Sequence, residues 1–141
     1  MAGEVASAGY SRTPLPRKLG IRPGARVALI GAPADIHATL GELPEGVRLL
    51  SRLGRELDVI VLFVDRLTDL RRRLPAAQAA MRADAGLWIA WPKRSSGVST
   101  DLTDALVREE GLATGLVDNK VCAIDATWSG LRFVVRLGDR A

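Results

Sequence analysis

ARVALIGAP, at residues 25–33, is a short apolar run that ends in a glycine and a proline. Val27, Leu29 and Ile30 supply its bulk, and Gly31 and Pro33 close it. A continuous apolar run of this kind is typical of a strand in a parallel sheet, because helices cover both faces of such a sheet. The stretch therefore predicts a buried strand that enters a turn at Gly31.

Two further runs predict strands of the same kind. DVIVLFV, at residues 58–64, has five β-branched or aromatic residues among its seven, which suits a buried, pleated position. LWIAW, at residues 87–91, is followed by Pro92. Its two tryptophans, Trp88 and Trp91, should point to opposite faces of the sheet because side chains alternate along a strand. Residues 47–50 are a weaker strand candidate.

Helical patterns alternate with these runs. Residues 34–40 are a candidate short helix. Apolar residues recur every three or four positions over residues 67–81, which is typical of an amphipathic helix, and Pro75 predicts a break within it. Residues 84–86 (Asp-Ala-Gly) predict a turn. A further helix is expected to begin at Thr100 or Asp101, whose side chains are good helix caps.

The last part of the chain changes character. Residues 121–125 and 128–137 predict two strands of a hairpin, the second with alternating apolar and more polar positions. The whole order predicts an α/β, Rossmann-like three-layer sandwich with a mostly parallel sheet and a C-terminal antiparallel hairpin. Residues 1–14 are expected to be a flexible N-terminal arm, and residues 15–141 a single α/β domain.

Composition narrows the class of protein. The chain has 141 residues, 48% of them hydrophobic, which suits one globular domain. One cysteine and one histidine exclude a disulfide framework and a metal site built from several of either residue. No secretory signal or membrane span is expected, which predicts a cytoplasmic location. The net charge of +4 permits nucleic-acid binding through the basic stretch around Arg17 and Lys18 but does not indicate it.

The order of elements is similar to that of class I methyltransferases, which end in an antiparallel hairpin. GARVALIGAP, DVIVLFV and MRADAGLWIAWPK stand where that family has its first strand with its glycine loop, its fourth strand and its fifth strand. The segments TPLPRKLGIRPG, LWIAWPKRSSGVSTDLTD and GLVDNKVCAIDATWSGLRFVV also resemble a family of short actinobacterial proteins of unknown function. The resemblance implies a cut-down methyltransferase-like fold.

The resemblance also implies where S-adenosylmethionine would bind, namely at a loop of the form GxGxG. Here Gly31 and Ala32 stand at the loop, but only Gly31 matches, and Pro33 removes an N–H. The family has an acid at the end of its second strand, whereas Ser51 and Arg52 follow residues 47–50 here. These departures argue against S-adenosylmethionine and leave the cofactor unknown.

Two sets of residues at predicted carboxyl ends of strands are candidates for ligand binding. Lys93, Arg94, Ser95 and Ser96 follow the strand at residues 87–91, where two cations and two hydroxyls could hold a phosphate or carboxylate. The alternative is a solvated connecting loop. Asp65 follows the strand at residues 58–64, and its alternative use is at the start of a helix.

The C-terminal part supplies the remaining candidates. Asp118, Asn119 and Lys120 interrupt an apolar run, either as a turn or bulge or as groups that face a site. Trp128 could cover the end of the core or form a binding surface. Cys122 is expected to be a buried, inert thiol.

Two classes of function follow. The first is a non-catalytic Rossmann-like module that binds a protein partner or a small anionic ligand and forms a homodimer through an edge strand bearing Trp128, Arg132 and Arg136. The alternative is a reduced S-adenosylmethionine-dependent methyltransferase-like enzyme, which rests on topology. A nucleic-acid partner is a weaker alternative, since aromatic residues for base stacking are scarce. No catalytic or metal-binding residue is assigned.

Overall fold

The computed structural model describes residues 13–140, so the predicted arm lies almost wholly outside the described residues. The described elements, in chain order, are α2 (Leu15–Leu19), β1 (Arg26–Ile30), α3 (Ile36–Leu40), β2 (Arg48–Leu50), β3 (Leu57–Phe63), α4 (Leu67–Ala79), β4 (Met81–Pro92), η1 (Arg94–Ser96), α5 (Asp104–Ala113), β5 (Val117–Ala123), β6 (Trp128–Val134) and η2 (Leu137–Asp139).

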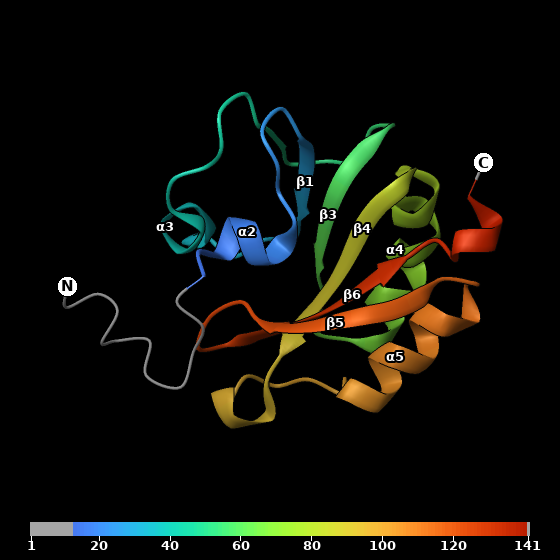
Figure 1. Cartoon of the computed structure of the whole chain (residues 1–141). Coiled ribbons are helices and arrows are strands. Elements are labelled where there is room, and N and C mark those ends of the chain that lie inside the picture. The colour runs from blue at the N-terminus through green and yellow to red at the C-terminus, as the bar shows by residue number, and fades with distance from the viewer. Residues whose placement is uncertain (1–12, 141) are drawn as a thin grey trace.

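The strands form one six-stranded sheet in the order β2-β1-β3-β4-β6-β5. The first four strands in this order are parallel, and β6 runs antiparallel to both of its neighbours, β4 and β5. This arrangement is the predicted Rossmann-like sheet with an antiparallel hairpin at its C-terminal end. The hairpin supplies β5 at the edge and β6 inside the sheet (Figure 1).

Helices cover both faces of the sheet and make three layers. Figure 1 shows α4 and α5 on one side of the sheet and α2 and α3 on the other. Leu70, Leu74 and Val107 from the first pair pack in one buried cluster with Trp91. Leu19 and Ile36 from the second pair pack in another cluster with Trp88. The two tryptophans therefore face opposite sides, as their spacing predicts.

Two predicted interruptions are absent from the structure. Helix α4 runs without a break from Leu67 to Ala79 with Pro75 inside it, so the predicted break is wrong. The apolar face of the helix is buried on both sides of Pro75. The predicted turn at residues 84–86 is also wrong, because these residues belong to the 12-residue strand β4. Met81 pairs with Leu57 and Gly86 pairs with Val59, and the register shifts between these two pairs.

The start of α5 differs from the prediction as well. Thr103 is the cap, and its side chain accepts a hydrogen bond from the N–H of Leu106. Asp101 instead accepts a hydrogen bond from the N–H of Leu67, at 2.9 Å, and so caps the distant helix α4. Sequence proximity cannot show such a cap, since the donor lies 34 residues away.

The predicted edge strand is wrong. Trp128 and Arg132 lie on β6, which pairs with β4 and β5 along both of its edges. The edges of the sheet are β2 and β5. Over residues 13–140, the structure has no helix long and apolar enough to cross a membrane.

Candidate functional site

The strand order changes direction at β1, which makes one end of this strand a natural ligand site. From β1 the chain passes to β2 on one side and then to β3 on the other. In open α/β sheets, ligands bind beyond the carboxyl ends of the strands where the order reverses, because the two connections leave a crevice there. In this protein the crevice lies beside Gly31, the residue after β1.

Gly31 is fixed by its backbone and by its neighbour. Its φ of +69° lies in the left-handed region, where a side chain is strained. A Cβ placed at Gly31 would lie 2.9 Å from the carbonyl oxygen of Phe63, at the end of β3. The turn can therefore pass close to β3 only with a glycine, as the sequence pattern implies.

A cavity of about 520 Å³ opens at this turn. Its volume falls within the range of roughly 300–1,000 Å³ that small-molecule sites occupy. Apolar side chains of β1, α3 and β2 form its walls, and the loop after β1 with Ser51 forms its rim. The lining consists of Leu29, Gly31, Ala32, Pro33, Ala34, Ile36, His37, Leu49, Leu50 and Ser51.

The polar groups of this cavity are few. Over the described part of the chain, the N–H of Ala32 has no hydrogen-bond acceptor and is free to donate to a ligand. Ser51 is exposed and offers a hydroxyl at the end of β2. None of the lining residues is acidic. The cavity thus offers apolar walls together with a backbone N–H donor and a hydroxyl at its rim.

Three other predicted residues lie at the same carboxyl edge of the sheet. Trp128 packs edge-on against Phe63, with ring centroids 5.1 Å apart. The N–H of Lys93 donates to the carbonyl of Thr127, which holds the hairpin tip against the end of β4. Asp65 is exposed two residues after β3, and its carbonyl oxygen accepts a hydrogen bond from the Thr100 hydroxyl. Its side chain does not cap α4.

Some polar groups of the loop after β4 form hydrogen bonds within the loop itself. Arg94, Ser95 and Ser96 form the short 3-10 helix η1. The Ser96 hydroxyl donates to the carbonyl of Lys93 at 2.6 Å and accepts from the N–H of Val98. Arg94 and Ser95 are exposed. The role of these four residues in ligand binding stays a prediction.

Asp118, Asn119 and Lys120 lie within β5 rather than in a turn. Asp118 pairs with Arg108 at 3.0 Å, and the pKa of the Arg108 guanidinium is raised by its hydrogen bonds to Asp118 and Asp104. The pairing register shifts between Asp118 and Lys120, so Asn119 is an extra residue of the bulge kind. The structure therefore gives these residues the bulge that the sequence left open.

Cys122 is buried, as predicted, in the cluster beneath α2 and α3. Burial raises the pKa of its thiol, and the charges of Lys18, Lys120 and Lys93 oppose that shift. Lys120 also donates from Nζ to the carbonyl of Lys18, at 3.2 Å, which ties β5 to α2. The three lysines thus gather around this side of the sheet.

The cavity includes residues that sequence reasoning did not select. Ile36, Leu49 and Ser51 come from α3, β2 and the residue after β2. Only their position in the sequence could have identified them, because each of the three residues follows or flanks the carboxyl end of a predicted strand. Their apolar or small side chains carried no chemical pattern that could single them out.

The fold is shared with solved structures of methyltransferases. No known family profile and no curated protein matches the sequence. A TehB-like SAM-dependent methyltransferase from Corynebacterium glutamicum is similar, with a TM-score of 0.59, 12% identity and coverage of 96% of this chain and 94% of that one.

Two further neighbours were solved with the cofactor or its demethylated product. Fibrillarin from Aeropyrum pernix, with natively bound S-adenosyl-L-methionine, gives a TM-score of 0.54 at 15% identity over 93% of this chain and 74% of that one. A DhpI–SAH complex gives 0.59 at 10% identity over 97% and 88%.

These neighbours correct the expectation about the cofactor. The departures at Pro33 and Ser51 argued against S-adenosylmethionine, whereas proteins that share this fold hold S-adenosylmethionine or S-adenosylhomocysteine. In this chain a cavity is present beside Gly31 although the loop lacks the second and third glycines. The chain has the class I methyltransferase-like fold, as its sequence resemblance implies.

Proposed function

We propose that this chain binds S-adenosylmethionine in the cavity beside Gly31 and is a small methyltransferase-like enzyme. The observation that carries the proposal is the cavity of about 520 Å³ at the carboxyl ends of β1 and β2, where the strand order reverses. The fold neighbours that hold the cofactor or its product support it. They fit the methyltransferase-like alternative better than a non-catalytic module.

The residues present can hold an adenosyl group without the acid of the family. Leu29, Ile36 and Leu49 offer apolar walls to an aromatic base. The free N–H of Ala32 can donate to the ligand, and the Ser51 hydroxyl can bond a ribose hydroxyl in place of a carboxylate. When bound, S-adenosylmethionine would supply an activated methyl group on its sulfonium.

Calorimetric titration with S-adenosylhomocysteine tests the binding step. Ala34 lines the cavity and is exposed, so Ala34→Trp fills the cavity without disturbing the core. Ala38 is also exposed, on α3, and is not among the lining residues. We expect Ala34→Trp to abolish the binding heat and Ala38→Trp to leave it unchanged. No heat with the unmodified chain, or equal heat with both variants, would overturn the proposal.

A second variant tests how the ribose is held. Ser51→Asp restores an acid at the end of β2, and a hydrogen bond to a charged group contributes roughly 1.5–3 kcal/mol. We expect S-adenosylhomocysteine to bind about tenfold more tightly to Ser51→Asp. Ser99→Asp makes the same change at an exposed position outside the cavity and should not alter affinity.

A further inference from the structure

A second cavity lies at the opposite edge of the sheet, where the parallel strands begin. It measures about 560 Å³. The connection from α2 to β1, the starts of β3 and β4, the end of β6 and the C-terminal turn contribute to its lining. The lining consists of Gly20, Arg22, Pro23, Gly24, Ala25, Asp58, Asp84, Arg132, Val134 and Arg140. It shares no residue with the cavity beside Gly31.

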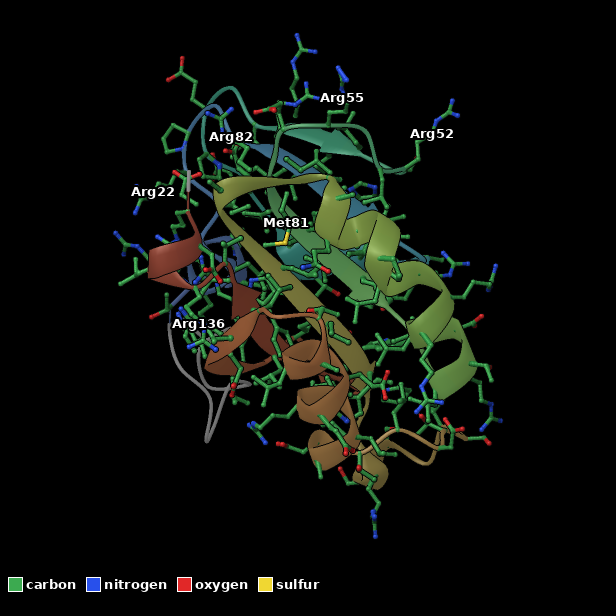
Figure 2. The ribbon with its side chains drawn as sticks, turned by 90° about the vertical axis from the view of Figure 1, so that its right-hand side faces the viewer. Arg22, Arg52, Arg55, Met81, Arg82 and Arg136 are labelled. Carbon is green, nitrogen blue, oxygen red and sulfur yellow. The ribbon has the colours of Figure 1, made fainter. Side chains whose placement is uncertain are left out.

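Three arginines from distant parts of the sequence meet in this cavity. Arg22 precedes β1, Arg132 lies on β6, and Arg140 follows η2. Figure 2 shows Arg22 on the left of the view, beside the C-terminal turn, with Arg55 away from it above the sheet. The fold thus places three guanidinium groups around one cavity.

The position of Arg132 is built into the sheet. A Cβ placed at Gly86 would lie 2.5 Å from Nε of Arg132 and 2.8 Å from its Nη2. The guanidinium therefore lies over the backbone of β4 in space that only a glycine leaves open. Its Nη1 donates to the Asn119 side chain at 3.3 Å. The bulge residue of β5 thus helps to orient it.

The two carboxylates of the cavity interact with residues other than its three arginines. Asp58 accepts the N–H of Arg26 at 2.9 Å and lies 3.5 Å from Nε of Arg82. Asp84 lies 3.9 Å from the same Nε. Within residues 13–140, Arg22, Arg132 and Arg140 form no salt bridge with a carboxylate.

The charges of these arginines act on one another. Burial lowers the pKa of the half-buried Arg132 guanidinium, and the charges of Arg140 and Arg22 lower it further. Like charges held together without a salt-bridge partner favour a bound anion, because an anion would relieve the repulsion.

We propose that this cavity binds a phosphate monoester of a small molecule through Arg22, Arg132 and Arg140. The guanidinium group of arginine can donate two parallel hydrogen bonds to phosphate oxygens, and a dianion matches several cations that lack salt-bridge partners better than a single negative charge does. A cavity of about 560 Å³ falls in the range of roughly 300–1,000 Å³ of small-molecule sites. It therefore has room for an organic group beside the phosphate.

The test is calorimetric titration at low ionic strength with phenyl phosphate, inorganic phosphate and benzoate. We expect phenyl phosphate to bind, inorganic phosphate to bind more weakly because it leaves the cavity part-filled, and benzoate to bind more weakly still. Since a charged hydrogen bond contributes roughly 1.5–3 kcal/mol, Arg22→Gln should weaken phenyl phosphate binding about tenfold or more. Arg22 is exposed, so this variant is expected to fold.

Two variants distinguish a specific phosphate site from non-specific attraction of anions to the positively charged protein. Arg55→Gln removes the same charge from an exposed residue outside the cavity and should leave affinity unchanged. Gly86→Ala removes no charge but displaces the Arg132 guanidinium, and it should weaken binding to a similar extent as Arg22→Gln. Equal losses in Arg22→Gln and Arg55→Gln would overturn the proposal.

Two further outcomes would overturn it as well: benzoate binding as tightly as phenyl phosphate, or tight binding of a single-stranded oligonucleotide in place of the small ester. Ala34→Trp, which blocks the other cavity, should leave phenyl phosphate binding intact. The proposal can thus stand or fall separately from the proposed cofactor site.

Discussion

The two faces of the sheet are covered by helices of very different length. On one face lie α4, with 13 residues, and α5, with 10. On the other lie α2 and α3, with 5 residues each. Helices of one or two turns are not stable alone in water, so α2 and α3 depend on tertiary contacts. The cavity beside Gly31 lies on the side of these short helices, since Ile36 of α3 lines it.

This difference separates the part of the molecule that stabilises the fold from the part that is proposed to bind. The long helices pack on the sheet through buried side chains such as Leu70, Leu74 and Val107. The short helix α2 is held in place by individual interactions, including the hydrogen bond of 3.0 Å from the Trp88 indole N–H to the carbonyl of Leu19. We therefore expect different responses to change on the two faces.

The largest effect is expected on the face of the long helices, at Gly111. A Cβ there would lie 2.1 Å from the ring of the buried Phe133, so Gly111→Ala overpacks the contact of α5 with β6. We expect it to reduce the free energy of unfolding by about 3 kcal/mol, measured by urea denaturation. Gly138→Ala, where no atom lies within 4 Å of the added Cβ, is the control and should be neutral.

Trp88→Phe tests how far α2 depends on a single hydrogen bond. The change removes the hydrogen bond to Leu19 and leaves a gap in the buried cluster. We expect a loss of about 2 kcal/mol and faster amide exchange over α2. Trp91→Phe truncates the tryptophan on the other face and should leave α2 protected. Equal rates of amide exchange over α2 in both variants would contradict the expected difference between the two faces of the sheet.

A substitution at Pro75 is expected to stabilise the protein. It is exposed inside α4, where it can donate no backbone hydrogen bond. Pro75→Ala should raise the free energy of unfolding by about 1 kcal/mol, after allowance for the greater freedom that it gives to the unfolded chain. A thermal melt measures the gain, and a fall in the melting temperature would show that the long helix needs its proline.

The smallest effect concerns reactivity and pH at Cys122. Burial raises the pKa of this thiol above its usual range near 8.5. The folded protein holds this proton to higher pH than the unfolded chain, so the associated stability is present below about 8.5 and lost as pH rises through the folded pKa. A disulfide reagent at pH 8 should react more slowly than with urea-unfolded protein. Trp88→Phe should shorten that delay.

Sequence alone predicted the strands and the layer order but not every boundary. Buried runs such as residues 58–64 carry their own pattern, because both faces of a central strand are apolar. The continuity of α4 through Pro75 and of β4 through residues 84–86 depends on neighbours that local propensity does not include. In these two places tertiary contacts override the usual signals of proline and glycine.

The site was predicted only in part for the same reason. Gly31 carries a conformational requirement that the sequence displays, and the structure places the cavity beside it. The remaining lining is apolar or small, so it shows no chemical pattern before folding. The cavity lined by Arg22, Arg132 and Arg140 was not predicted from the sequence. Arg22 lies more than a hundred positions before the other two residues, so no local pattern links them.

The extra residue Asn119 has a consequence for how copies of this chain meet. Among residues 13–140, strand β5 pairs with another strand on one side only, and such edges favour the addition of a further strand, which leads to aggregation. The shift at Asn119 breaks the regular spacing of the strand partway along it, and Lys120 places a charge on its exposed part. The same irregularity that orients Arg132 thus makes this edge a poor template for amyloid-like stacking.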